Sequence, residues 1–235
     1  MQQAGDQEEA REVFEVVLKY LPHRAVAVLN LADTEHALED IARARLHYRQ
    51  YLALTKEEQR RLLRTAEHTR RPKDRAIVTL MLYTGIRISE CAALNLDDVY
   101  AQGRKRRVTV RSGKGDKYRV VPLNGTACES LQAWLQERAQ KFAGQKTDEA
   151  FFLNPQGGRM TTAALDLIVR KVGQEAGLEI SAHILRHTLL TNLVRQGNDL
   201  VLVAEIGGHK RLETTRRYSL PSSEDKKKAM AALSD

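Results

Sequence analysis

Apolar side chains recur at helical spacing over most of this chain. Before residue 55 the pattern is charged and rich in Ala and Leu, with one helical run that Pro22 breaks and a second over 34–48. The stretch 74–83 is apolar on nearly every side, so it predicts a helix buried at the centre of a domain. Further helices are expected over 127–141, 161–176, 184–196 and 200–206, with glycines at their ends.

Strand-like segments lie on either side of one glycine-containing loop. Residues 107–111 and 118–123 are strand-forming, and the Ser-Gly-Lys-Gly-Asp segment between them is typical of a hairpin. Lys114 would lie at the turn of this hairpin. We therefore predict a mainly α fold with a small antiparallel β-sheet, of the α+β class.

The clearest helix start is the capping-box sequence Thr55-Lys56-Glu57-Glu58, which an apolar helical face follows. We place the main domain boundary here. Residues 1–54 are expected to form a short helical N-terminal region, and residues 55–235 a domain with a C-terminal tail. Within that tail, residues 222–233 have the pattern of one more short helix, with three lysines on its surface.

The chain carries a formal net charge of +8, from 38 Lys and Arg against 30 Asp and Glu. Such a balance suits a polyanionic partner, although a basic soluble protein without one has the same composition. The basic side chains concentrate between residues 104 and 119, where Asp116 is the one acid. A local field of this kind binds phosphates and makes affinity salt-dependent. The eight basic residues are Arg104, Lys105, Arg106, Arg107, Arg111, Lys114, Lys117 and Arg119.

The two cysteines, Cys91 and Cys128, form no CxxC pair, so neither a disulfide framework nor a structural zinc site is indicated. The N-terminus is acidic and lacks the pattern of a signal peptide, and no apolar run reaches membrane-spanning length. These features predict a cytoplasmic protein that makes no use of a membrane.

Several polar residues stand where a phosphate site would need them. Arg87 follows a glycine break at a predicted helix start, and His183 and Arg186 are spaced to share one helical face. His209 follows two glycines and precedes Tyr218 by nine positions. Each also has an ordinary explanation, as a helix cap, a surface arginine or a packed tyrosine. Their combination favours a site that cleaves phosphate esters, because a tyrosine nucleophile needs cations around its target.

Two neighbours of these residues are expected to be structural. Glu90 should pair locally or brace the helix that begins near Arg87. His187 lies one step round the helix from Arg186 and is interpreted as a core histidine.

The stretches TGIRISE, SGKGDKYRVVPL, HILRH and GGHKRLETTRRYS together resemble the tyrosine recombinases of the phage-integrase family. They occur in the family's order, and the resemblance extends from Thr55 onward. It implies that Tyr218 attacks the scissile phosphate and forms a 3′-phosphotyrosyl link. It further implies that Arg87, Arg186 and His209 hold the non-bridging oxygens of that phosphate.

The same resemblance assigns the proton transfers. Lys114 would protonate the leaving 5′ oxygen, with Lys117 as the competing candidate, and His183 would assist the deprotonation of Tyr218. No metal and no cofactor is implied, because the phosphotyrosine conserves the bond energy.

The implied function is site-specific recombination or integration of double-stranded DNA by a homotetramer, whose C-terminal segment docks on a neighbouring subunit. Two other functions fit the same residues. A type IB topoisomerase uses the same nucleophile and relaxes DNA without exchanging partners. A catalytically idle DNA-binding regulator would keep the fold alone, but it has no chemical need for all six candidate residues.

Overall fold

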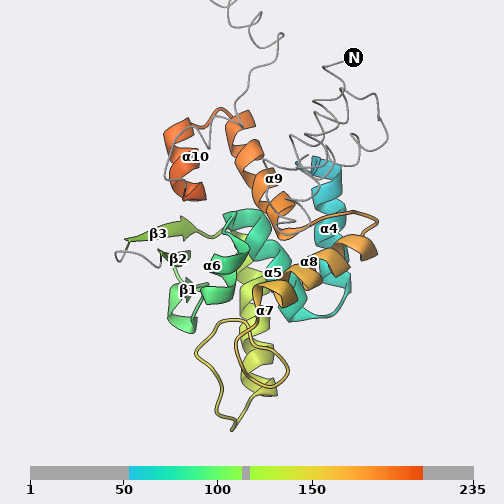
Figure 1. Cartoon of the computed structure of the whole chain (residues 1–235), viewed down its shortest axis with the longest axis vertical. Helices are drawn as coiled ribbons and strands as arrows, with labels where there is room; N and C mark the ends of the chain where they lie inside the picture. Colours follow the sequence, from blue (N-terminus) through green and yellow to red (C-terminus); the bar gives the residue numbers. More distant parts are fainter. Residues whose placement is uncertain (1–52, 113–116, 209–235) are drawn as a thin grey trace, which may run out of the picture.

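A computed structural model describes residues 53–112 and 117–208 of the chain (Figure 1). Helices dominate the described part, and one small antiparallel sheet lies at its side, as the sequence predicts. The elements in chain order are α4 (Lys56–His68), α5 (Pro72–Thr84), α6 (Ile88–Ala93), a 3-10 turn (Leu96–Asp98), β1 (Val99–Tyr100), β2 (Arg107–Ser112), β3 (Lys117–Pro122), α7 (Gly125–Lys141), α8 (Thr162–Glu175), α9 (Ala182–Arg195) and α10 (Leu200–Gly207).

Helix α5 is the central element, and α4, α7, α8 and α9 pack around it. Its apolar side chains are buried on nearly every side, so the predicted central helix is confirmed. It begins at Pro72, two residues earlier than expected, because a proline at the first helical position needs no hydrogen-bond partner for its nitrogen. It ends at Gly85, whose N–H donates to the carbonyl of Met81.

The predicted capping box at the start of α4 is present. The Thr55 hydroxyl accepts from the N–H of Glu58 at 3.2 Å, and the Glu58 carboxylate accepts from the N–H of Thr55 at 2.8 Å. The N–H of Leu54 donates to the hydroxyl of Thr188 at 2.9 Å. This last hydrogen bond attaches the start of the domain to α9.

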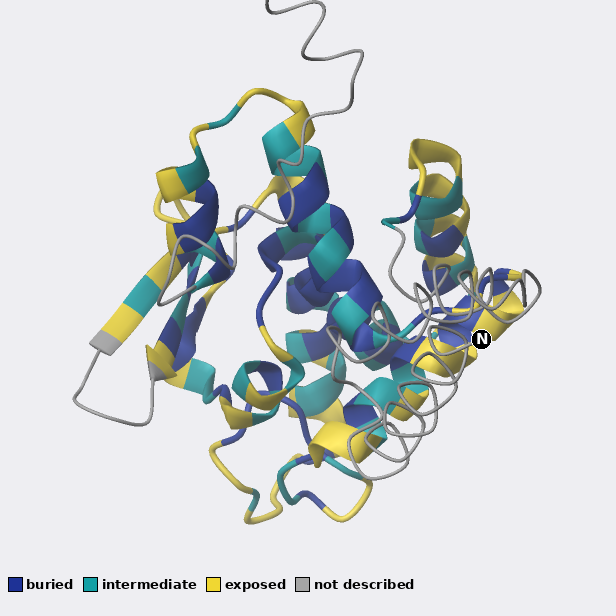
Figure 2. Cartoon of the chain, turned by 45° about the horizontal axis from the view of Figure 1, so that its top comes forward, coloured by how far each residue is buried: buried dark blue, intermediate teal, exposed yellow. Residues whose placement is uncertain are grey.

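The sheet has the order β1-β2-β3, and both strand pairs are antiparallel. Val108 pairs with Val99 on one side and with Val121 on the other, and all three side chains are buried. Tyr118 and Val120 on β3 point to the exposed face. The sheet therefore has one buried and one exposed face, as is common for antiparallel sheets (Figure 2).

Aromatic side chains fill the core between α7 and the segment that precedes α8. The indole N–H of Trp134 donates to the carbonyl of Phe151 at 3.0 Å, and Phe151 meets Phe152 edge-on at 4.9 Å between ring centroids. This packing lies beside the first turn of α5, where the ammonium of Lys73 donates to the carbonyl of Leu153 at 3.3 Å and lies 5.8 Å from the centroid of the Trp134 ring.

Some predictions concern residues outside the described ranges. They concern residues 1–52 of the expected N-terminal region 1–54, and the turn with Lys114. They also concern the segment after Gly208, which contains His209, Tyr218 and the expected helix at 222–233. The domain boundary at Thr55 therefore stays a prediction. Within 53–112 and 117–208, no helix is both long and apolar enough to cross a membrane.

Candidate active site

Arg87 occupies the N-cap of α6, two residues after the left-handed turn at Gly85. That turn requires glycine, because Gly85 has φ 60° and an added Cβ would lie 2.9 Å from a methyl carbon of Leu189. The Arg87 guanidinium donates to Glu90 and to the carbonyl of Gly208, both at 2.9 Å. Its side chain is 43% exposed, so further N–H groups of the guanidinium face solvent.

Arg186 projects from α9 into the same region and is only 6% exposed. Its two terminal nitrogens donate to the carbonyl of Gly85 at 2.5 Å and to that of Gly207 at 2.6 Å. Burying a guanidinium is costly unless carbonyls or carboxylates accept its hydrogen bonds, and these two carbonyls do so. Arg186 thereby joins the C-terminal ends of α5 and α10.

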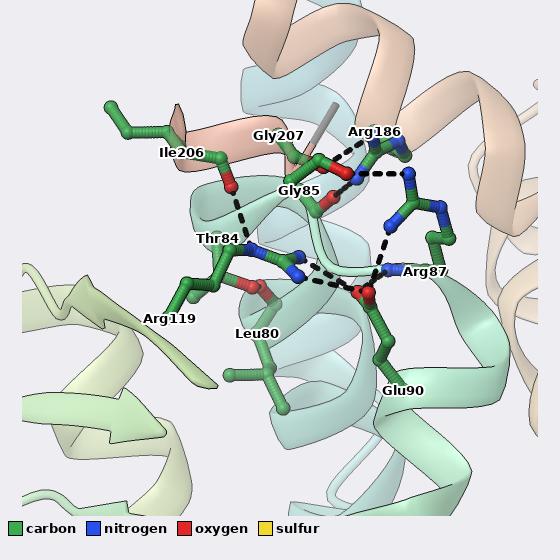
Figure 3. Close-up of polar contacts among 10 residues, drawn as sticks. Leu80, Thr84, Gly85, Arg87, Glu90, Arg119, Arg186, Ile206 and Gly207 are labelled. Atoms are coloured by element: carbon green, nitrogen blue, oxygen red, sulfur yellow. Dashed lines mark hydrogen bonds and ion pairs between the residues drawn. The ribbon is translucent and has the colours of Figure 1, made fainter. Parts of the chain in front are cut away.

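The two arginines converge on consecutive backbone carbonyls (Figure 3). Arg186 donates to the carbonyl of Gly207, and Arg87 donates to the carbonyl of Gly208. Gly208 has φ 61° and ends α10. His209 is the next residue in the sequence. Residues that lie 21 and 121 positions apart in the chain therefore meet at the end of α10.

His183 belongs to the first turn of α9, so it shares a helix with Arg186 as predicted. The N-cap of this helix is Ser181, not His183. Burial, followed by the nearby charges of His183 and Arg195, lowers the pKa of His187 to about 4. His187 is therefore neutral at physiological pH, which suits the interpretation as a core histidine.

Glu90 braces the start of α6, and the sequence predicted this local part of its role. Its carboxylate accepts from the backbone N–H of Arg87 at 2.7 Å. Sequence reasoning missed that Arg119 on β3 also binds both carboxylate oxygens, at 2.9 and 2.7 Å. The alternation along β3 contained a signal, because Arg119 shares the inward face with Val121 while Tyr118 and Val120 point outward.

Three of the eight residues in the predicted basic segment have a carboxylate or aromatic partner within the described part of the chain. Arg119 pairs with Glu90, Arg111 pairs with the buried Asp98 at 2.6 Å, and Arg107 lies over the ring of Tyr100 at 4.2 Å. The side chains of Lys114 and Lys117 lie outside the described part. Among the described side chains of this segment, Arg104, Lys105, Arg106 and Arg111 are exposed, and of these Arg111 is paired with Asp98.

Both cysteines are buried free thiols. Burial and the neighbouring Glu90 carboxylate raise the pKa of Cys91 to about 12, so this thiol stays protonated. Among the described residues, no group of His, Cys, Asp and Glu side chains is arranged to hold a metal ion.

The structure thus brings together Arg87 and Arg186 and puts His183 on the helix of Arg186. The other three predicted site residues, Lys114, His209 and Tyr218, lie outside the described residues. Their roles stay predictions. The described backbone reaches Gly208, one residue before His209.

Comparison with known proteins places this arrangement in a family. Residues 53–224 match the model of the phage integrase family. The chain is 40% identical over 149 residues to the tyrosine recombinase XerC of Actinobacillus pleuropneumoniae serotype 7 (strain AP76), which covers 63% of this chain and 47% of XerC. It is 35% identical over 182 residues to XerA of Thermococcus kodakarensis, which covers 75% of this chain and 61% of XerA.

Among solved structures, the chain is similar to the XerH site-specific recombinase bound to its difH substrate. The TM-score is 0.65 at 29% identity, over 76% of this chain and 53% of XerH. This chain thus spans about half the length of the relatives that it matches. Since the family model covers well over half of the chain, the protein belongs to the phage integrase family.

Proposed function

We propose that this chain is a site-specific DNA recombinase that cleaves and rejoins DNA through a 3′-phosphotyrosyl intermediate. The convergence of Arg87 and Arg186 on the carbonyls of Gly207 and Gly208 carries the proposal. Two cations beside the backbone that leads directly into His209 form a site suited to a phosphate. Membership of the phage integrase family supports the same chemistry.

In this proposal Arg87, Arg186 and His209 bind the non-bridging oxygens of the scissile phosphate. Negative charge grows on these oxygens as the tyrosine attacks, so donors fixed beforehand stabilise the transition state more than the ground state. Loss of one such donor typically costs about 10²- to 10³-fold in rate. Arg186 is suited to this role because its buried position leaves it little freedom to reorient.

Tyr218 is the proposed nucleophile. Its hydroxyl oxygen forms the new bond to phosphorus while the bond from phosphorus to the 5′ oxygen breaks. His183 assists removal of the tyrosine proton, and Lys114 supplies a proton to the 5′ oxygen, with Lys117 as the competing acid. Attack by the 5′-hydroxyl of another strand reverses the step and completes the exchange without a metal or a cofactor.

The proposed partner is double-stranded DNA. XerH, which is 29% identical over the matched residues, was solved bound to its difH substrate. We further propose that four copies assemble on two DNA sites, with residues 222–233 of each copy docking on a neighbour. We also propose that the protein acts in the cytoplasm, as its sequence leads us to expect.

The test is covalent trapping on a library of nicked duplexes with randomised sequence. Wild-type protein should form a protein–DNA adduct that survives denaturing electrophoresis, and Tyr218→Phe should abolish the adduct, because phenylalanine has no oxygen to attack phosphorus. Tyr118→Phe is the matched control, because this exposed tyrosine loses the same hydroxyl and should still trap DNA.

Undiminished trapping by Tyr218→Phe would exclude this nucleophile. Absence of any adduct with the wild type would refute the enzymatic proposal in favour of an idle DNA-binding protein. Sequencing the junctions formed between two trapped duplexes separates recombination from topoisomerase activity, since only recombination exchanges partners.

A further inference from the structure

Arg119 links three elements of the candidate site although it lies far from Arg87 and Arg186 in the chain. It projects from β3, and its side chain is 15% exposed. The fork of its guanidinium donates to both carboxylate oxygens of Glu90 on α6, and its Nε donates to the carbonyl of Ile206 on α10 at 3.1 Å (Figure 3). A rigid planar fork suits such bidentate pairing.

The Glu90 carboxylate is shared between two arginines. Besides Arg119 it accepts from the N–H of Arg87 at 2.7 Å and from the Arg87 guanidinium at 2.9 Å. Burial acts to raise the Glu90 pKa, but the hydrogen bonds from Arg119 and Arg87 hold it at about 2. Glu90 is therefore charged at neutral pH. Because Arg119 fixes the position of this carboxylate, it also limits the positions that the Arg87 guanidinium can take.

The turn at Gly208 lies directly against the Arg119 guanidinium. A Cβ added to Gly208 would lie 2.6 Å from Nη1 and 2.8 Å from Cζ of Arg119, which no real contact allows. The carbonyl of the same glycine accepts from Arg87. Arg119 thus contacts the last residues of α10 at two points, through a hydrogen bond to Ile206 and through packing against Gly208.

We infer that Arg119 is a positioning residue, which sets the placement of Arg87 and of the turn leading into His209 through Glu90, Ile206 and Gly208. The inference rests on the proposed function for its catalytic consequence. Arg119 belongs to the basic segment expected to attract DNA. Its low exposure, and the use of both terminal nitrogens in hydrogen bonds to Glu90, assign it instead to the interior of the site.

The first test compares Arg119→Lys with Arg71→Lys. Lysine keeps the charge and the long stem but cannot form the bidentate fork. Arg71 is the control for an arginine–glutamate pair away from the site, because its Nη2 donates to both oxygens of Glu175 at 2.7 and 2.8 Å. It lies at the N-cap of α5 while Gly85 lies at the C-cap, about 20 Å away along 13 residues.

Cleavage is measured at saturating DNA on a nicked duplex recovered from the randomised library. Arg119→Lys should lower the rate about 10²-fold, the typical cost of a misplaced catalytic group, and leave DNA affinity unchanged. Arg71→Lys should cleave at the wild-type rate. Equal rates for Arg119→Lys and the wild type would overturn the inference while leaving the proposed function intact.

A duplex with a 5′-bridging sulfur separates positioning of the phosphate site from positioning of the acid. Sulfur departs without a proton, so this substrate bypasses the general acid. The slow cleavage by Arg119→Lys should persist on this substrate, because the variant misplaces the groups that stabilise charge on the non-bridging oxygens. Full rescue would mean that Arg119 acts through the hairpin acid and would overturn the inference.

Amide hydrogen exchange of the DNA-free protein provides a measurement that needs no activity. In Arg119→Lys, exchange should quicken in α6 and over residues 204–208, whereas Arg71→Lys should leave both regions at wild-type rates. Unchanged exchange in both regions would overturn the positioning role. If the wild type traps no DNA, the proposed function fails and this measurement still decides the role of Arg119.

Discussion

Glu90 is the residue through which pH should act on this site. Its pKa falls from the ordinary 4.5 to about 2, because the hydrogen bonds from Arg119 and Arg87 outweigh the effect of burial. A carboxylate with a lowered folded-state pKa stabilises the fold above its unfolded pKa, and the stabilisation disappears as pH falls through the folded value. The contribution of Glu90 should therefore be complete above about pH 5 and vanish between pH 4.5 and 2.

Urea unfolding of the wild type and Glu90→Gln between pH 2 and 7 checks this prediction. The variant should be less stable at pH 7, since two arginines lose their carboxylate, and the difference should shrink toward pH 2. One pKa unit corresponds to about 1.4 kcal/mol, which sets the scale. A difference that stays constant over this range would contradict the assignment.

The residue scale also shows what a sequence can predict about a site. Arg87 and Arg186 could be identified because each stands in a recognisable local motif, TGIRISE and HILRH. Arg119 could not be separated from the other basic residues around it by composition. Its role depends on Glu90, 29 positions away, and on the end of α10, 87 positions away.

At the scale of elements, the end of α8 depends on a close approach at Gly173. A Cβ there would lie 2.4 Å from Cγ1 of Ile180 and 3.0 Å from the carbonyl oxygen of Leu178. Gly173→Ala should therefore destabilise the fold by about 1–3 kcal/mol, as overpacking typically does. Gly125→Ala in α7 is the control, because nothing lies within 4 Å of its Cβ position. Equal unfolding midpoints for the two variants would refute the packing argument.

Elements with strong end signals were predicted within two residues. The capping box at Thr55 and the left-handed glycine at Gly85 fix helix ends through local hydrogen bonds, so the sequence contains them. Strand β1, Val99–Tyr100, was missed, because two residues are too few to show an alternation. Only its pairing with β2 makes it a strand.

For the whole molecule, the fold class and family followed from the sequence, whereas the assembly of the site did not. Arg186 reaches Gly85 across 101 positions, and Arg87 reaches Gly208 across 121. Such contacts depend on how α5, α9 and α10 pack around a common core. Helical periodicity indicates which face of each helix is buried, but not which helix ends meet.

The surface charge of the whole molecule should appear in the salt dependence of DNA binding. Arg104 and Lys105 are exposed in the segment before β2, whereas Arg111 pairs with Asp98 and Arg119 pairs with Glu90. Arg104→Gln with Lys105→Gln should flatten the slope of log affinity against log salt by up to about 1.8, or about 0.9 per lost phosphate contact. Fluorescence anisotropy on two unrelated duplexes should give equal changes, since phosphate contacts carry no sequence information.

Lys141→Gln with Lys146→Gln, at the end of α7 and beyond, is the control that should keep the wild-type slope. A change confined to one duplex would mean that the segment reads bases.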